Sequence, residues 1–411
     1  MPALRDDARA IWSAASAAVL PERLVATRLS LDDLALDGVE RIVVVGAGKA
    51  AAGLAAGVEA LMGRAVLERH SVSGLVSVPD GCGRALERIE VRQTRPAGRN
   101  LPTPAVVAAT HEMLATVAGL GPRDLVIVVL TGGGSALLAA PREGVSLEEK
   151  IAVTRQLSES GADIHALNAA RKRLSLVKGG GLARACTAGR MLVLVLSDVI
   201  GNDLGTIASG PCMPDDPSSS GAWTTPSGCR VRHVLLGDNA TAVAAATAAA
   251  SRARYEVVGS DRVAEASAEA TGRRLAAAGM KLVEAVRRDG RPRAIVEGGE
   301  ATVTVPPDHG LGGRNQQTAL AALDAVASSG GPWPEELLIA SFGTDGEDGP
   351  TDAAGAFVDA GVAAASAAEG LDVRRALCRC DAHPFFTAAG GLIRTGPTGT
   401  NVADIRLVLV Q

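Results

Sequence analysis

Short apolar runs alternate with alanine-rich segments through the first half of the chain. Strands are predicted at residues 41–45, 73–78, 124–130 and 191–196. Helices are predicted at residues 49–62 and 104–117, and from a capping box at Ser146-Leu-Glu-Glu149 onward. The run at 124–130 lacks polar alternation, which is typical of a strand buried on both faces. Repeated strand, glycine loop and helix units predict an α/β domain whose parallel sheet is covered by helices on both faces.

The second half changes character after a loop at residues 211–228 that is rich in Pro, Ser, Gly and Asp. Helices are predicted at residues 238–252 and 261–278. Strands are predicted at residues 294–297, 301–305, 337–341, 355–359 and 406–410. This half is expected to form a second, smaller α/β domain with a mixed sheet. The expected domains are residues 1–236 and residues 237–411.

An apolar stretch at residues 10–20 follows two arginines and has the outline of a secretion signal. Asp6 and Asp7 lie inside what would be the basic leading segment, which argues against export. The stretch is also too short to span a bilayer. We therefore expect an amphipathic helix in a cytoplasmic protein that has no membrane partner.

Composition narrows the function classes. The 411 residues are 47% hydrophobic and 21% charged, a globular mix at a length that favours two domains. Lys and Arg total 41 against 45 Asp and Glu, a net charge of −4, so nucleic acid is not an expected partner. Four Phe, three Trp and one Tyr offer little surface for stacking on bases. The six Cys form no C-x-x-C pair and are expected to be reduced.

Glycines and polar residues stand where three predicted strands end: Gly46-Ala-Gly48-Lys49, Thr131-Gly-Gly-Gly-Ser135 and Ser197-Asp198. Ligands bind at the carboxyl ends of the strands in such sheets, so we expect an active site in the first half. The G-x-G-x-x-A pattern at Gly46 lacks the acidic residue that a dinucleotide site has about 20 residues further on. Lys49 instead adds positive charge to a helix start, which suits a phosphate or carboxylate; a solvated lysine is the alternative.

Three consecutive glycines, Gly132, Gly133 and Gly134, exceed what a tight turn needs. Their backbone N–H groups and the Ser135 hydroxyl can converge on an anion. We therefore expect nucleotide phosphates at residues 132–135, the alternative being a purely structural turn between strand and helix.

A polar-dense segment follows at residues 161–175. Asn168 and Arg171 lie three residues apart and share a helix face. An arginine fork beside an amide suits a carboxylate or a phosphate. Lys178 and its basic neighbours can be solvated charges, and His165 alone is weak evidence for a general base.

Several acidic and amide side chains complete the candidate set. Asp198, at a strand end, is a candidate Mg²⁺ ligand, because this ion usually takes one or two carboxylates plus substrate oxygens. Asp345 and Asp348, in an acidic glycine-rich segment, are candidates for binding a metal or a hydroxyl group. Further candidates stand in a tight turn, at a helix start and in a hydroxyl-rich loop: Glu300, Arg314 and Asn401.

With these motifs, in this order, the chain resembles the glycerate 2-kinases of the MOFRL type, which are often named hydroxypyruvate reductases. The motifs that carry the resemblance are Gly46-Ala-Gly-Lys-Ala50, Thr131-Gly-Gly-Gly-Ser-Ala136, Ser160-Gly-Ala-Asp-Ile164, Asn168 with Arg171, Lys178-Gly-Gly180, Leu196-Ser-Asp-Val199, Ile207-Ala-Ser-Gly-Pro211, Gly298-Gly-Glu300, Gly312-Gly-Arg-Asn-Gln316, Thr344-Asp-Gly346, Asp348-Gly-Pro350 and Thr395-Gly-Pro-Thr-Gly-Thr-Asn401.

The resemblance implies a Rossmann-like first domain and ATP-dependent phosphorylation of D-glycerate, or a related small sugar acid, at the 2-hydroxyl with Mg²⁺. It suggests Lys49 and Arg314 as catalytic cations that face each other across an interdomain cleft. We expect residues 132–135 to bind ATP phosphates, and Asp198 and Asp345 to hold Mg²⁺. The expected substrate-binding residues are Asn168, Arg171, Glu300 and Asn401. The expected partner is this small molecule, and a homodimer is left open.

The chain departs from the family pattern at three places. Thr94-Arg95-Pro96 stands where a His-Pro-x-Pro-Asp stretch is usual, Gly181 replaces an Arg, and Asn202 replaces an Asp. These departures keep one alternative open, a catalytically impaired homologue that binds sugar acids. The common name of the family keeps another open, an NAD(P)-dependent hydroxypyruvate reductase.

Overall fold

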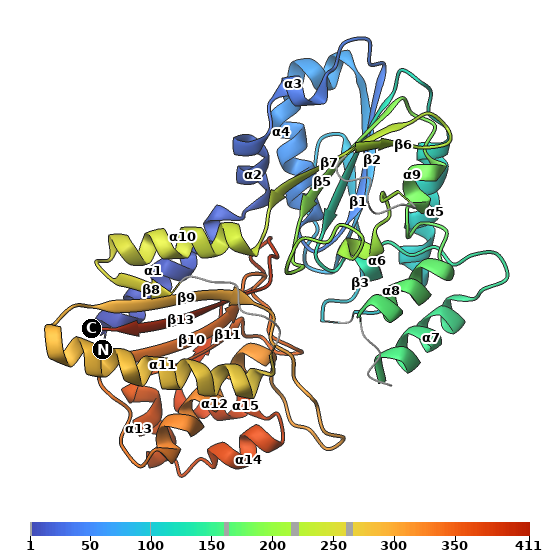
Figure 1. Cartoon of the computed structure of the whole chain (residues 1–411). Helices are drawn as coiled ribbons and strands as arrows, with labels where there is room; N and C mark the ends of the chain where they lie inside the picture. Colours follow the sequence, from blue (N-terminus) through green and yellow to red (C-terminus); the bar gives the residue numbers. More distant parts are fainter. Residues whose placement is uncertain (1, 99, 160–163, 215–221, 260–265) are drawn as a thin grey trace. The chain divides into compact units, whose positions relative to one another are not determined.

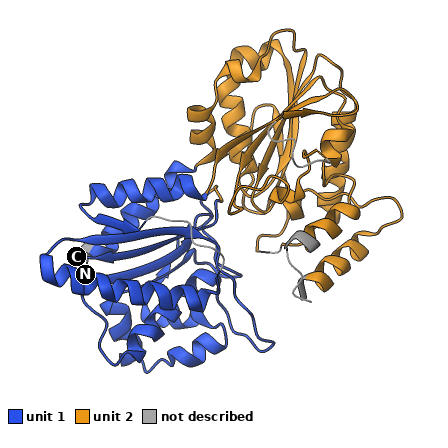
Figure 2. Cartoon of the chain, in the orientation of Figure 1, with its two compact units in different colours: residues 1–19, 239–398, 402–411 blue, residues 20–238, 399–401 orange. Residues whose placement is uncertain are grey.

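The structure is a computed structural model that describes residues 2–98, 100–159, 164–214, 222–259 and 266–411. The chain forms two compact units (Figure 2). Unit 2 comprises residues 20–238 and 399–401, and unit 1 comprises residues 1–19, 239–398 and 402–411. The chain passes from unit 2 to unit 1 after Asp238, beside the expected boundary.

One element lies outside its expected domain. Helix α1 (Pro2–Ala18) belongs to unit 1 although it begins the chain. Its apolar stripe, with Leu4, Ile11 and Ala15 buried, packs against α10 (Asn239–Arg252) and β13 (Asp404–Val410). The Arg5 guanidinium also donates to the buried carboxylate of Asp359. Such long-range packing leaves no signal in the spacing of the N-terminal residues.

Unit 2 is built on a seven-stranded sheet with the order β3-β2-β1-β4-β5-β7-β6 (Figure 1). The strands are β1 (Arg41–Ala47), β2 (Ser71–Pro79), β3 (Ile89–Arg95), β4 (Leu125–Thr131), β5 (Arg190–Leu196), β6 (Ala222–Thr224) and β7 (Arg230–Gly237). All neighbours are parallel except β6 and β7. The four predicted strands are present, and the Rossmann-like parallel sheet is confirmed. Strands β3 and β7 escaped prediction because they are partly exposed and contain arginines.

Helices cover both faces of this sheet (Figure 1). They are α2 (Pro21–Arg28), α3 (Leu31–Leu34), α4 (Ala51–Arg69), α5 (Pro104–Ala118), α6 (Gly134–Leu137), α7 (Leu147–Glu159), α8 (Ile164–Arg173) and α9 (Gly181–Ala185), with a 3₁₀ turn, η1 (Ile207–Ser209). The predicted capping box begins α7: the N–H of Glu149 donates to Ser146 Oγ at 3.0 Å, and the N–H of Ser146 donates to Glu149 Oε2 at 2.7 Å.

Unit 1 contains a six-stranded mixed sheet with the order β12-β11-β10-β13-β9-β8, as predicted. Its remaining strands are β8 (Glu256–Gly259), β9 (Arg293–Gly299), β10 (Leu337–Gly343), β11 (Gly355–Val358) and β12 (Leu392–Ile393). Helices α1 and α10 pack on one face. The other helices are α11 (Ala268–Asp289), α12 (Arg314–Ser328), α13 (Ala360–Ala368), α14 (Val373–Cys378) and α15 (Ala382–Ala389). Only β8 pairs in parallel within this described sheet, with β9.

The predicted strand at residues 301–305 is wrong. Thr302 makes a single bridge with Ser267, and the Val305 side chain is exposed. Pro306 and Pro307 follow and cannot donate backbone hydrogen bonds. The alternation of Thr and Val in this segment therefore has no buried face behind it.

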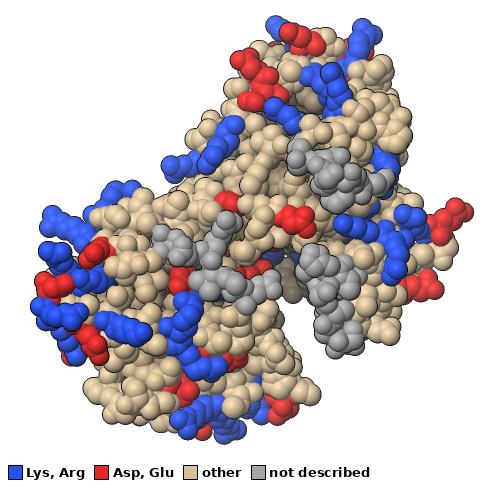
Figure 3. Space-filling model, in the orientation of Figure 1, with Lys and Arg blue, Asp and Glu red and all other residues tan. Residues whose placement is uncertain are grey.

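Basic and acidic side chains are interspersed on the face drawn in Figure 3. None of the helices in the described part of the chain is both long and apolar enough to span a membrane. All six cysteines are free thiols.

Candidate functional site

Lys49 lies where β1 meets α4 in unit 2, beside the end of β4. A Cβ added to Gly48 would lie 2.0 Å from Thr131 Oγ1, so only glycine permits this close approach. The N–H of Lys49 then donates to the carbonyl oxygen of Gly132 at 2.9 Å, and the N–H of Ala50 donates to Thr131 Oγ1 at 3.1 Å. The backbone of Lys49 is therefore fixed to the β4–α6 connection.

The glycine loop, residues 132–135, brings several predicted residues together. Gly133 has a φ of 78°, which places it in the left-handed region just before α6. A Cβ on Gly133 would lie 3.4 Å from Cγ of Lys49 and 3.8 Å from Nη2 of Arg95. Two cations thus flank this loop, one of them the buried Arg95 that marks a departure from the family pattern.

Gly132 packs against a polar pair. A Cβ at this position would lie 2.1 Å from Asn401 Nδ2 and 2.2 Å from Asp198 Oδ2. The Asn401 amide also donates to Asp198 Oδ2 at 3.2 Å. The predicted Asp198, Asn401 and glycine loop therefore form one site in unit 2.

We expect Gly132→Ala to abolish productive binding at this loop while leaving unit 2 folded. The added methyl group displaces the Asp198 and Asn401 side chains and costs about 1–3 kcal/mol of stability by overpacking. Isothermal titration of ATP together with urea unfolding would measure both effects. Gly119→Ala is the matched control, because its Cβ would be no closer than 3.6 Å to any atom at an ordinary φ of −93°. ATP affinity that is equal in both variants would contradict the expectation.

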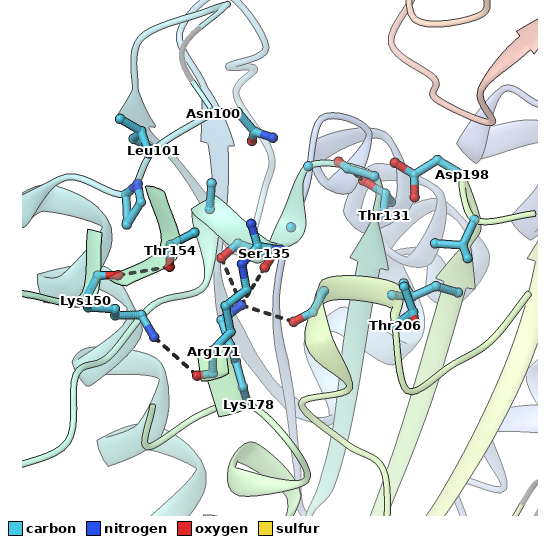
Figure 4. A pocket seen from close by; sticks show the side chains of 18 of the residues that line it. Asn100, Leu101, Thr131, Ser135, Lys150, Thr154, Arg171, Lys178, Asp198 and Thr206 are labelled. Atoms are coloured by element: carbon cyan, nitrogen blue, oxygen red, sulfur yellow. Dashed lines mark hydrogen bonds between the residues drawn. The ribbon is translucent and has the colours of Figure 1, made fainter. Parts of the chain in front are cut away.

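A cavity of about 170 Å³ lies next to the glycine loop (Figure 4). Three cations line it: Lys150 from α7, Arg171 from α8 and Lys178 from the segment that follows α8. Asp198 is the one carboxylate among the described lining residues. We refer to this space as the cation cavity, meaning Lys150, Arg171 and Lys178 with the glycine loop.

Lys178 holds the glycine loop in place through hydrogen bonds of its ammonium group. Its Nζ donates to Ser135 Oγ at 2.8 Å, to the Ser135 carbonyl oxygen at 2.9 Å and to the Ala208 carbonyl oxygen at 3.3 Å (Figure 4). All three acceptors are neutral. Burial, followed by repulsion from Lys150 and Arg171, holds the pKa of Lys178 well below its ordinary value. The expectation of a solvated Lys178 is therefore wrong.

Asn168 does not line the cavity and is connected to Ser135 through Ser209. Its Oδ1 accepts a 3.0 Å hydrogen bond from Ser209 Oγ, which lies 3.1 Å from Ser135 Oγ. Ala208 and Ser209 both have left-handed backbones, with φ values of 51° and 62°, a conformation that costs about 1–2 kcal/mol per non-glycine residue. Since packing holds this strained turn against Ser135, we assign Asn168 a positioning contact with Ser209, and its contact with substrate stays a prediction.

The predicted residues of unit 1 gather around Arg314, the first residue of α12. Its Nε and Nη2 donate to the two carboxylate oxygens of Asp404 at 2.7 and 2.9 Å, and Nη1 lies 3.1 Å from Glu300 Oε1. Burial opposes the charge, but attraction to Asp404 outweighs it and raises the pKa of Arg314 well above its ordinary value. Arg314 is thus held in one orientation by two carboxylates.

The Asp348 carboxylate, from the loop that follows β10, binds backbone N–H groups in the first turn of α12. It accepts the backbone N–H groups of Asn315 at 2.9 Å and Gln316 at 2.8 Å. Burial raises the pKa of Asp348 to about 6 even though these two N–H groups favour the ionised form. A Cβ on Gly343 would lie 2.9 Å from Asp345 Oδ1 and 3.6 Å from Asp404 Oδ1, so Asp345 belongs to this acidic cluster of unit 1. Asp345 and Asp198 are in different units, and their joint role in binding Mg²⁺ stays a prediction.

Sequence reasoning missed Lys150. It lies on the inward stripe of α7 with Leu147, Ile151 and Thr154, and only 4% of it is exposed. A lysine on the apolar face of a capped helix was the available signal. The motif at residues 160–163 lies outside the described residues, and the side chain of His165 is likewise not described.

Two of the three departures from the family pattern have local structural reasons. A Cβ on Gly181 would lie 2.0 Å from the Leu176 carbonyl oxygen. Asn202 has a left-handed φ of 58°, which asparagine tolerates better than most residues, and its Nδ2 donates to Asp238 Oδ2 at 2.7 Å. Both residues therefore suit the backbone that this chain adopts.

A Rossmann-like unit with a glycine-rich loop beside a cavity lined by cations, joined to a mixed-sheet unit, is an arrangement that suits a phosphotransferase. Residues 7–244 match DUF4147, a domain of unknown function, and residues 293–404 match the MOFRL family. The chain is 34% identical over its whole length to the human protein named "Glycerate kinase", of which 94% is covered. The crystal structure of glycerate kinase from Thermotoga maritima superposes with a TM-score of 0.82 at 32% identity, with both chains fully covered.

The chain therefore belongs to the glycerate kinase family. An Agrobacterium vitis protein with the name "Putative hydroxypyruvate reductase" is 35% identical over 90% of this chain and 87% of its own length. The resemblance inferred from the sequence motifs is thus confirmed. The relatives carry both of the expected names, glycerate kinase and hydroxypyruvate reductase.

Proposed function

We propose that this protein transfers the γ-phosphoryl group of ATP to the 2-hydroxyl of D-glycerate, or of a related small sugar acid. The observation that carries the proposal is the cation cavity beside the glycine loop, in a chain of the glycerate kinase family. Phosphoryl transfer depends on positioning and charge neutralisation more than on covalent chemistry. A site of backbone N–H groups and cations meets that need without a dedicated base.

The residues of unit 2 are assigned to the nucleotide. The glycine loop binds the phosphates of ATP, and Lys49 beside Gly133 stabilises the charge of the migrating phosphoryl group. Asp198, whose Oδ2 accepts a hydrogen bond from the Asn401 amide, fits Mg²⁺, which usually takes one or two carboxylates together with phosphate oxygens, and Asp345 stays the second predicted ligand. Asp198 would hold the ion there, and the ion would neutralise phosphate charge.

Glu300, Arg314 and Asn401 remain our candidates for orienting the sugar acid, whereas Arg171, which was predicted with them, lines the cation cavity of unit 2 and is assigned to an anionic group there. Arg314 is a strong candidate because its guanidinium is fixed by Asp404 and Glu300 while 30% of the side chain stays exposed. That Lys49 and Arg314 serve the same transfer step stays a prediction. A cytoplasmic location also stays a prediction, and the six free cysteines support it.

Two parallel assays test the proposal against its alternatives. The purified protein is incubated with ATP, Mg²⁺ and D-glycerate while ADP is measured, and separately with NADH and hydroxypyruvate while NADH absorbance is followed. We expect ADP to form only in the presence of glycerate, with no oxidation of NADH. Oxidation of NADH without ADP formation would favour the reductase. Binding of sugar acids with turnover in neither assay would favour a protein that has lost catalysis.

A further inference from the structure

We propose that Lys150 and Arg171 form a subsite for the terminal phosphate groups of the nucleotide, next to the glycine loop. This inference rests on the proposed function and adds Lys150, which belongs to none of the sequence motifs. The two side chains come from neighbouring helices, α7 and α8, and line the same cavity as Ser135 (Figure 4).

Both cations have hydrogen-bonding capacity left over. Lys150 Nζ makes one long contact, 3.5 Å to the carbonyl oxygen of Arg171. The Arg171 guanidinium finds no acceptor among the residues that the structure describes, and neither side chain has an ion-pair partner there. Lys150 is buried and Arg171 is half-buried. Cations that are withdrawn from water are normally paired, so this arrangement is typical of an anion-binding site.

The number of charges favours phosphate over the carboxylate of the sugar acid. A single carboxylate would compensate one of the three cations in the cavity. The terminal phosphates of a nucleoside triphosphate carry several negative charges and present many acceptor oxygens to the lysines, the arginine fork and the backbone N–H groups.

The titration of Lys150 makes the subsite testable. Burial, followed by repulsion from Arg171, lowers the pKa of Lys150 to about 8. The other charged groups that line the same cavity are Arg171 from α8, Lys178 from the segment after α8 and Asp198 after β5. Lys150 therefore loses its charge as the pH rises from 7 to 9 in the free protein, and affinity for a phosphate anion at this subsite falls with it.

The experiment measures the dissociation constant of inorganic triphosphate by isothermal titration at pH 7 and pH 9. It compares the full-length protein with Lys150→Arg, Lys150→Met and Arg155→Ala. Arg155 is the matched control, because it is a cation on α7 that points to solvent. Losing one charge-assisted contact is expected to weaken binding about tenfold. We expect Lys150→Met to bind about tenfold more weakly at pH 7, and Arg155→Ala to bind as the unmodified protein does.

The titrations at two pH values separate the effect of the Lys150 charge on affinity from the effect of its packing. We expect the affinity of the unmodified protein, relative to Lys150→Arg, to fall several-fold between pH 7 and pH 9, because arginine keeps its charge. An affinity ratio that does not change with pH would overturn the inference. So would a Lys150→Met variant that binds triphosphate normally but loses affinity for D-glycerate.

The inference and the proposed function can fail separately. Triphosphate binding that depends on Lys150, in a protein that does not phosphorylate any sugar acid, supports the subsite and contradicts the kinase. Normal phosphorylation of glycerate, with triphosphate affinity that is unchanged in Lys150→Met, supports the kinase and contradicts the subsite.

Discussion

Replacing Lys49 with methionine is expected to lower the rate of phosphoryl transfer by roughly 10²–10³-fold, the usual effect of removing one well-placed charge-stabilising group. The backbone N–H of Lys49 donates a hydrogen bond to Gly132, and the Lys49 side chain runs along Gly133. The positive charge therefore stands beside the loop to which we assign the ATP phosphates. Methionine keeps the length of the side chain and removes only the charge.

Steady-state kinetics with ATP and D-glycerate measure this effect, and kcat is the parameter expected to fall. Arg155→Ala again serves as the control, because it removes an exposed cation from the same unit and should change kcat less than twofold. Near-normal turnover by Lys49→Met would contradict the role assigned to Lys49. A loss confined to KM for ATP would make Lys49 a binding residue only.

Replacing Asp404 with alanine is expected to destabilise unit 1 by about 3 kcal/mol, at the lower end of what breaking a buried ion pair costs. Asp404 is fully buried and accepts two hydrogen bonds from Arg314. Without it, the guanidinium keeps only its contact with Glu300 and its partial exposure. Because Arg314 then loses its fixed orientation, we also expect turnover to fall.

Urea unfolding followed by tryptophan fluorescence measures the change in stability, since Trp12 and Trp333 report on unit 1 and Trp223 on unit 2. Asp308→Ala is the matched control. It removes a carboxylate that is 80% exposed and pairs with Arg379 at 3.5 Å, so its cost should stay below about 1 kcal/mol. Equal midpoints for the two variants would contradict the importance of the Arg314–Asp404 pair.

The strands at the centre of each sheet were predicted from the sequence better than the strands at its edges. A continuous apolar run such as the one within residues 124–130 is typical of a strand buried on both faces, and β4 stands in the middle of its sheet. Edge strands such as β3 lack that signal because one side of each is exposed. The false strand at residues 301–305 is the converse case, in which alternation was present but no partner face existed.

Only part of the site was predicted, because local motifs are visible in the sequence and contacts between distant segments are not. Glycines that permit close backbone approach, at positions 48 and 132, leave a clear mark in the sequence, and the polar residues next to them are in the site. The partners of those residues come from distant segments: Asn401 reaches Asp198, and Asp404 reaches Arg314. Lys150 was not predicted because a lysine within an ordinary helix is usually solvated, and its position on the apolar face of α7 is a weak signal beside that expectation.

Phosphorus NMR of the reaction with ATP, Mg²⁺ and D-glycerate tests the central claim most directly. We predict that a phosphate monoester resonance grows together with ADP, and that its coupling to a single carbon-bound proton identifies 2-phosphoglycerate. The resonance should be absent when glycerate is omitted. A product phosphorylated on the primary hydroxyl, with coupling to two protons, would contradict the assigned position of transfer. Failure of any phosphate monoester to form, with a folded protein that oxidises NADH in the presence of hydroxypyruvate, would contradict the account as a whole.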